Sequence, residues 1–183
     1  NRMKYPFLQL SDVNAPYAEQ LKEAAARVID SGWYLNGNET KALERELAQV
    51  CQTAHALTVS NGLDALRLIF RAYIRLGRLH EGDEVIVQAN TYIASVLAIH
   101  DAGLTPVLVD PSESTYNLDS SLIERAITEK TRAILVVHLY GTPCWDSKIK
   151  EIAERHDLLV IEDNAQAIGA LADTPGLNCT YPT

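Results

Sequence analysis

Short runs rich in valine, isoleucine and leucine alternate with amphipathic segments along most of this chain. We expect strands where these runs fall, at residues 55–60, 83–88, 105–110, 131–141 and 158–163. Because the runs are apolar on both faces of a strand, the strands need cover on both faces, as in a parallel sheet between helices. The sequence therefore predicts an α/β fold with a mostly parallel sheet, and helices on both of its faces at residues 62–77, 91–103, 120–128 and 144–157.

The amino-terminal part follows a helical pattern instead. Apolar residues recur at helical spacing over residues 16–32 and 37–51. The loop between these two predicted helices is rich in glycine and asparagine and carries the adjacent aromatic residues Trp33 and Tyr34. We therefore expect a helical segment at the start of the chain.

Composition sets the broad class of the protein. With 47% hydrophobic residues among 183, the chain can bury one domain. We expect residues 53–183 to form this large domain and residues 1–52 to pack on it. A net charge of −8 argues against a broad nucleic-acid surface. No apolar run has the length of a membrane span, and three cysteines without a CxxC motif favour a cytoplasmic protein.

Polar residues cluster where the predicted strands end, which is where open α/β sheets bind ligands. Asn61 follows the first predicted strand, and Gly62 begins the predicted helix directly after it. Glycine lets the backbone approach a ligand closely, and a helix N-terminus favours a phosphate group. An ordinary capped turn would use the same residues, and the chain lacks the dinucleotide and P-loop glycine fingerprints.

Two other strand ends carry groups suited to a planar cation. Tyr92 starts a helix after a strand and could lie flat against a ring, or it could pack in the core. Asp163 ends a buried strand, where a protonated pyridine nitrogen could stabilise its charge. Asp163 could instead cap the next turn. Gln166 could donate to, or accept from, a substituent of the same ring. A metal site is disfavoured, because no histidine or cysteine lies nearby at ligand spacing.

A phosphate site, an aromatic platform and a buried acid together suit a flat, phosphorylated, cationic heterocycle. At this point the chain resembles the DegT/DnrJ/EryC1/StrS family of pyridoxal-phosphate-dependent sugar aminotransferases. The matching segments, in the family's order, are SGWYLNGNETKALERELA, SNGLDAL, DEVIVQANTYIASVLAI, AGLTPVLVD, VVHLYG and VIEDNAQAIGA. The resemblance implies the large domain of the fold-type I pyridoxal-phosphate (PLP) architecture.

The resemblance also implies roles for the residues at the strand ends. The backbone N–H groups of Gly62 and Leu63 would bind the cofactor phosphate, with Asn61 beside them. Tyr92 would stack on the pyridine ring. Asp163 would be the catalytic partner of its protonated nitrogen, which lets the ring accept electrons.

Further roles implied by the resemblance concern the ring substituent, the substrate and the attachment residue. Gln166 would hydrogen-bond the 3-hydroxyl oxygen of the cofactor, and the loop with Trp33 and Tyr34 would lie close to the substrate. Family members also need a Schiff-base lysine, which we expect just after Thr183. The segment between Ala170 and Tyr181 is shorter than the family leads us to expect, which implies that residues are missing there. We also expect the small C-terminal domain of the family to be absent from this sequence.

The activity implied by the resemblance is transfer of an amino group from glutamate to a nucleotide-linked keto-deoxysugar. The motifs look most like those of dTDP-3-keto-6-deoxyhexose 3-aminotransferases, which points to carbon 3 of the sugar. The family acts as homodimers with active sites at the subunit interface. Alternatives are amination of a 4-keto sugar, a dehydratase of the same family with histidine in place of the lysine, and a non-catalytic α/β domain that binds a metal or another ligand.

Overall fold

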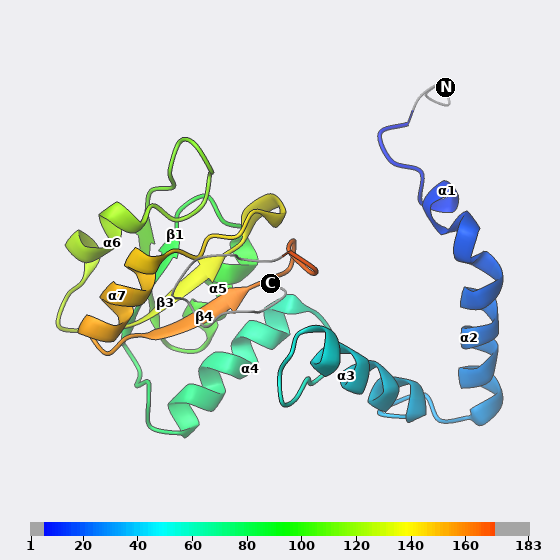
Figure 1. The fold of residues 1–183 in the computed structure, drawn as a ribbon. Helices are drawn as coiled ribbons and strands as arrows, with labels where there is room; N and C mark the ends of the chain where they lie inside the picture. The colour runs from blue at the N-terminus through cyan, green and yellow to red at the C-terminus, as the bar shows by residue number, and fades with distance from the viewer. Residues whose placement is uncertain (1–5, 171–183) are drawn as a thin grey trace. The chain divides into compact units, whose positions relative to one another are not determined.

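The structure is a computed structural model that describes residues 6–170 (Figure 1). The chain divides into two compact units, residues 1–46 and 47–183. The expectation that residues 1–52 pack on a large domain stays a prediction.

A parallel sheet forms the centre of the second unit (Figure 1). Within the described residues it has four strands in the order β2-β1-β3-β4, and each neighbouring pair is parallel. The strands are β1 (Glu84–Gln88), β2 (Thr105–Val109), β3 (Thr131–Val137) and β4 (Leu159–Asp163). All of them fall inside predicted apolar runs, so the predicted parallel α/β sheet is confirmed.

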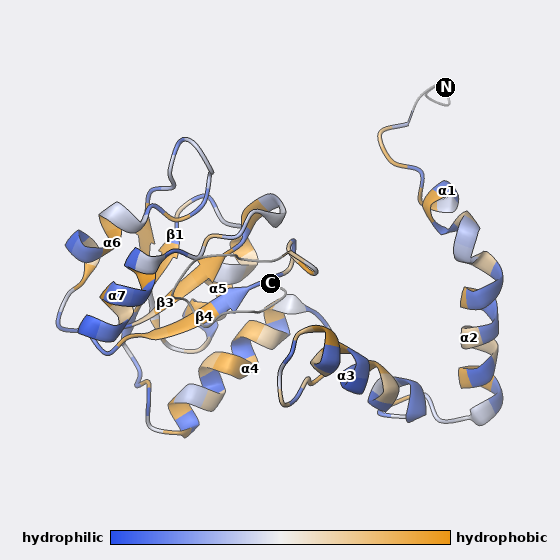
Figure 2. Cartoon of the chain, viewed as in Figure 1, coloured by the Kyte–Doolittle hydropathy of each residue, from blue (hydrophilic) through white to orange (hydrophobic). Residues whose placement is uncertain are grey.

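Helices cover both faces of this sheet, whose strands are strongly hydrophobic (Figure 2). On one face, Phe70 and Ile99 are fully buried in a core cluster with Val87 of β1. On the other face, Ile123 and Ile152 are fully buried in a second cluster. The helices, in chain order, are α4 (Gly62–Arg75) and α5 (Ile93–Asp101) on the first face, and α6 (Ser120–Ala126) and α7 (Ser147–Arg155) on the second.

The predicted strand at residues 55–60 does not form. No strand within the described residues pairs with this segment, and the side chains of Leu57 and Val59 are exposed. An apolar, β-branched composition favours an extended chain, but a strand also needs a neighbour to complete its hydrogen-bond ladder. The prediction was therefore wrong at this segment.

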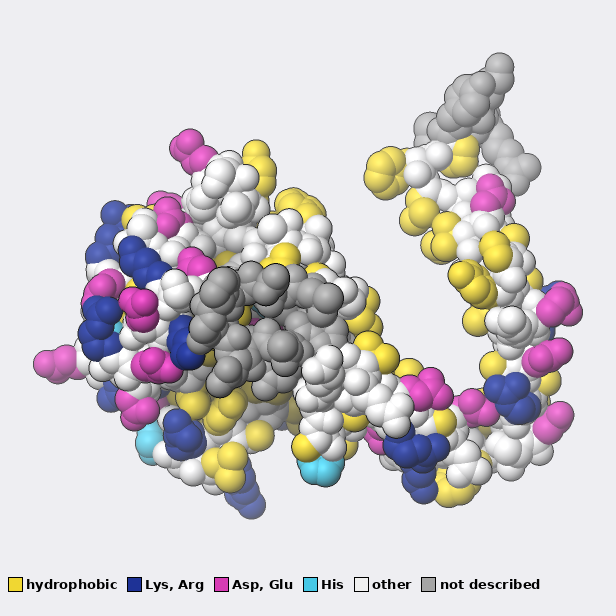
Figure 3. Space-filling model, in the orientation of Figure 1, with side chains coloured by type: hydrophobic (Ala, Val, Ile, Leu, Met, Phe, Trp, Pro, Cys, Tyr) yellow, Lys and Arg dark blue, Asp and Glu magenta, His cyan; other side chains and the backbone are white. Residues whose placement is uncertain are grey.

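The amino-terminal helices are largely exposed. No residue of these helices is buried, and their apolar side chains lie on the surface (Figure 3). Gly32 ends the first of the two predicted helices with a positive φ of 64°. The elements are α1 (Leu10–Asn14), the 3₁₀ helix η1 (Ala15–Tyr17), α2 (Ala18–Ser31) and α3 (Asn38–Val50), of which α2 and α3 were predicted and α1 was not.

None of the helices within residues 6–170 is both long enough and apolar enough to cross a lipid bilayer.

Replacing Phe70 with alanine should lower the free energy of unfolding by about 3–5 kcal/mol, because the substitution leaves a cavity in the core. Urea unfolding followed by circular dichroism measures this change. Leu68→Ala is a matched control on the same helix, since the Leu68 side chain is 52% exposed. We expect the control to cost less than about 1 kcal/mol. Equal losses in the two variants would contradict the place of Phe70 in the core.

Candidate functional site

A cavity of about 600 Å³ lies at the carboxyl ends of the strands. The neighbouring strands β1 and β3 continue into helices on opposite faces, α5 and α7, and such a divergence leaves a crevice between the strand ends. The structure brings together all of the residues expected to bind a cofactor, because each lines this cavity: Asn61, Gly62, Leu63, Tyr92, Asp163 and Gln166.

The start of α4 forms one wall of the cavity. Asn61 caps this helix, because its side-chain Oδ1 accepts a hydrogen bond of 2.9 Å from the backbone N–H of Asp64. The preceding N–H groups, those of Gly62 and Leu63, have no acceptor within residues 6–170. A Cβ atom at Gly62 would meet no other atom within 4 Å, so the space in front of the helix is open. Two free donors at the positive end of a helix form an anion site.

The Asp64 carboxylate, which lies close to this helix end, has partners within the protein that offset its charge. The Ser60 hydroxyl, and after it the Arg67 guanidinium, hold the pKa of the Asp64 carboxyl below its usual range. Arg67 also donates from Nε to Asp101 of α5 over 2.8 Å, which links the two helices. The negative charge of Asp64 therefore has its own partners and opposes an incoming anion less than a free carboxylate would.

Tyr92 stands at the first turn of α5 with 74% of its surface exposed. The alternative that this residue packs in the core was therefore wrong. As a lining residue of the cavity, its ring offers a flat apolar surface to a ligand.

Asp163, the last residue of β4, is half-buried rather than fully enclosed. Its Oδ2 accepts a hydrogen bond of 2.8 Å from the Ser95 hydroxyl, and its Oδ1 accepts one of 3.2 Å from the backbone N–H of Ala165. The second bond is the turn-capping role that the sequence left open. No lysine, arginine or histidine within residues 6–170 forms an ion pair with this carboxylate. A cationic ligand in the cavity would supply the missing charge.

Gln166 is held by the turn that follows β3. Its Oε1 accepts a hydrogen bond of 2.7 Å from the backbone N–H of Tyr140. Tyr140 has a φ of 56°, an unfavourable conformation for a tyrosine, in the 3₁₀ turn η2 (Leu139–Gly141). A strand was predicted over residues 131–141, but β3 ends at Val137 and the turn η2 follows it. With Oε1 engaged, the side-chain NH₂ of Gln166 remains to donate to a ligand.

Ser95 and Thr91 are polar residues of this site that the sequence reasoning did not identify. Ser95 is 1% exposed, and its Oγ lies 3.0 Å from the Thr91 hydroxyl as well as beside Asp163. The available signal was a serine inside the otherwise apolar start of a helix, three positions after Tyr92.

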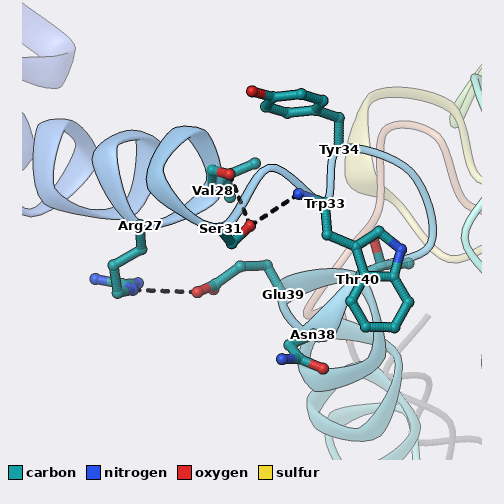
Figure 4. Close-up of a pocket in the computed structure, with 9 residues that line it drawn as sticks. Arg27, Val28, Ser31, Trp33, Tyr34, Asn38, Glu39 and Thr40 are labelled. Atoms are coloured by element: carbon teal, nitrogen blue, oxygen red, sulfur yellow. Dashed lines mark hydrogen bonds and ion pairs between the residues drawn. The ribbon is translucent and has the colours of Figure 1, made fainter.

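Trp33 and Tyr34 belong to the amino-terminal unit and line a separate cavity of about 330 Å³ (Figure 4). The Trp33 ring turns toward Asn38 and Thr40, whereas the Tyr34 ring points the other way (Figure 4). Gly37 is required in this loop, because a Cβ atom there would lie 2.9 Å from the Trp33 carbonyl oxygen. The expected place of this loop near a substrate stays a prediction.

Other reactive groups do not reach the main cavity. Burial raises the pKa of the Cys144 thiol to about 12, which makes it a poor nucleophile. None of the lysines within residues 6–170 lines the cavity. The segment between Ala170 and Tyr181, and Thr183 with the lysine expected after it, lie outside the described residues. No cluster of three or more histidine, cysteine or acidic side chains suited to a metal ion occurs in residues 6–170.

Known proteins resemble this chain over most of its length. A curated relative from Aneurinibacillus thermoaerophilus, named dTDP-3-amino-3,6-dideoxy-alpha-D-galactopyranose transaminase, is 51% identical over 166 residues. This match covers 91% of the chain but 45% of the relative. The chain thus spans about half the length of such relatives.

Two solved structures share the fold. The S. venezuelae protein DesV, solved in complex with a ketimine intermediate, superposes with a TM-score of 0.82 at 46% identity and covers 92% of this chain and 47% of DesV. A GDP-4-keto-6-deoxymannose-3-dehydratase with a trapped PLP-glutamate geminal diamine superposes with a TM-score of 0.77 at 30% identity. That match covers 84% of this chain and 40% of the dehydratase.

The family model for the DegT/DnrJ/EryC1/StrS aminotransferase family matches residues 17–174. The match takes in α2, α3, the sheet and every residue that lines the main cavity. This chain therefore belongs to the DegT/DnrJ/EryC1/StrS aminotransferase family.

Proposed function

We propose that this chain is the cofactor-binding part of a PLP-dependent sugar aminotransferase. The observation that carries the proposal is the Asp163 carboxylate, which lines the cavity without a cationic partner among the described residues. The free N–H groups of α4 lie on the same cavity and suit a phosphate. A ligand with an anionic phosphate and a cationic ring fits both, and PLP is such a ligand.

Each lining residue then has a task in holding the cofactor. Gly62 and Leu63 donate their backbone N–H groups to the phosphate, with Asn61 fixing the helix start. Tyr92 covers one face of the ring and excludes water there. Gln166 donates its side-chain NH₂ to the ring's 3-oxygen, since its Oε1 is already bound to Tyr140.

Asp163 carries the chemistry that this chain contributes. When bound, PLP supplies a ring that accepts the electrons released as the substrate loses its α-proton. The Asp163 carboxylate keeps a proton on the ring nitrogen, and the resulting positive charge makes electron acceptance favourable. Proton movement at the substrate carbon needs a lysine, which we propose follows Thr183.

The proposed reaction moves an amino group from glutamate to carbon 3 of a dTDP-linked keto-deoxysugar. The name of the Aneurinibacillus relative supports the nucleotide and the carbon, and the trapped PLP-glutamate adduct of the dehydratase supports the amino donor. We further propose a cytoplasmic homodimer with active sites at the interface, in which residues 1–52 pack on the large domain and the loop with Trp33 and Tyr34 lies near the sugar.

A keto-deoxysugar dehydratase is the second candidate, because a dehydratase of this kind superposes on the chain with a TM-score of 0.77. Both enzymes would use the same cavity. They differ in the residue expected after Thr183, which is lysine in the aminotransferase and histidine in the dehydratase.

Asp163→Asn should leave PLP binding detectable by absorbance but reduce turnover about a hundredfold or more, because asparagine cannot keep the ring nitrogen protonated. Asp157→Asn is the matched control, since Asp157 is an exposed residue in the turn before β4 with a φ of 51° that asparagine tolerates. Near-normal activity of Asp163→Asn would refute the assigned role.

Borohydride reduction of the PLP-loaded full-length protein should attach the cofactor to a lysine directly after Thr183. Peptide mass spectrometry locates the label. A label on a lysine of the described residues would contradict this site, and the absence of any label together with a histidine at that position would favour the dehydratase.

Incubation of the full-length protein with glutamate and dTDP-3-keto-6-deoxyhexose should give 2-oxoglutarate and an amino sugar, which mass spectrometry detects. We expect a rate at least about tenfold higher than with the 4-keto isomer, because a misplaced carbonyl cannot reach the reacting position. A faster reaction with the 4-keto sugar would move the predicted site of amination to carbon 4.

A further inference from the structure

The Asp163 carboxylate is attached to α5 through a chain of two hydroxyl groups. The Ser95 hydroxyl donates to Asp163 Oδ2 over 2.8 Å, and the Thr91 hydroxyl lies 3.0 Å from Ser95 Oγ. Ser95 is 1% exposed and does not line the cavity, whereas Thr91 and Asp163 do. Ser95 therefore reaches a ligand in this cavity through Asp163.

The direction of this hydrogen-bond chain follows from counting protons. An ionised carboxylate can only accept, so the single hydroxyl proton of Ser95 points at Asp163. Ser95 Oγ is then left as an acceptor, and the proton between the two hydroxyls belongs to Thr91. The chain thus runs from Thr91 through Ser95 to Asp163, with each donor polarising the next.

The chain also sets the orientation of the carboxylate. Oδ1 of Asp163 is held by the N–H of Ala165 at 3.2 Å, and Oδ2 by Ser95 at 2.8 Å. Bonds to both oxygens fix the rotation of the carboxylate plane and replace part of the hydration lost beside the sheet. Each oxygen keeps a further lone pair for a ligand.

We infer that Ser95 and Thr91 are positioning residues that hold Asp163 ready for a protonated ring nitrogen. This inference rests on the proposed PLP function. A purely structural role, in which Ser95 only pins α5 to β4, makes a different prediction. If Ser95 only holds α5 against β4, its loss would weaken the binding of any ligand in the cavity. If Ser95 positions Asp163, its loss would weaken the binding of ligands with a ring nitrogen.

Two cofactors separate these roles. We propose to measure equilibrium dissociation constants of the full-length protein for PLP and for its 1-deaza analogue, in which a C–H group replaces the ring nitrogen. Ser95→Ala should weaken PLP binding about tenfold, as expected for a hydrogen bond to a charged group. Binding of the analogue should change less than about twofold, because the analogue does not use the Asp163 charge.

Thr91 provides an independent pair of variants. Thr91→Val keeps the side-chain shape but removes the hydroxyl, and it should weaken PLP binding about threefold. This loss is smaller than that of Ser95→Ala, because Thr91 acts on Asp163 through Ser95. Thr91→Ser keeps the hydroxyl and should bind PLP as the unmodified protein does. Thermal denaturation of the cofactor-free protein shows whether Ser95→Ala folds. If it does not fold, the two Thr91 variants test the inference instead.

The outcomes distinguish failure of this inference from failure of the proposed function. Equal weakening for both cofactors, or no weakening for either, would overturn the positioning role while leaving PLP binding intact. Failure of the unmodified protein to bind PLP would overturn the proposed function and this inference with it. Selective loss for PLP in Ser95→Ala and Thr91→Val, with recovery in Thr91→Ser, would establish the role.

Discussion

The pairing of β3 with β4 is the interaction on which the rest of the site depends. Val137 lies opposite Asp163 in this parallel ladder. Because side chains alternate between the faces of a strand, Asp163 shares the face of Ile161, which packs in the core beneath α4 and α5. Glu162 points to the other face. A register shift of one residue in β4 would bring Glu162 to the cavity and turn Asp163 away from it.

On the opposite face of the sheet, a buried histidine stabilises the ends of the same strands. His138 Nδ1 accepts the backbone N–H of Cys144 over 2.8 Å, and Nε2 lies 3.4 Å from Glu162. The backbone N–H of His138 donates to the carbonyl of Asp163 over 3.2 Å. One residue thus ties together the end of β3, the loop after it and the end of β4. Groups held on such a rigid edge lose little freedom when a ligand binds.

Much of the fold could be predicted because burial on two faces leaves a local pattern in the sequence. The runs that became β1 to β4 are rich in valine, isoleucine and leucine, and helical segments alternate with them along the chain. The same reasoning failed at residues 55–60, where the composition favours a strand but no neighbour within the described residues completes it. A pattern of hydrophobicity reports what a segment prefers, whereas a strand requires a partner elsewhere in the chain.

By itself, the sequence determined which side chains stand at the ends of the strands and at the start of the helices, because those positions follow from local periodicity and capping. Asn61, Tyr92 and Asp163 were found in this way. The tertiary structure alone decided how they work. The hydroxyl that donates to Asp163 belongs to Ser95, separated from it by 68 positions, and the backbone N–H that donates to Gln166 belongs to Tyr140, separated by 26. Such partners are chosen by the packing of α5 and the β3 turn against β4, which no local pattern in the sequence encodes.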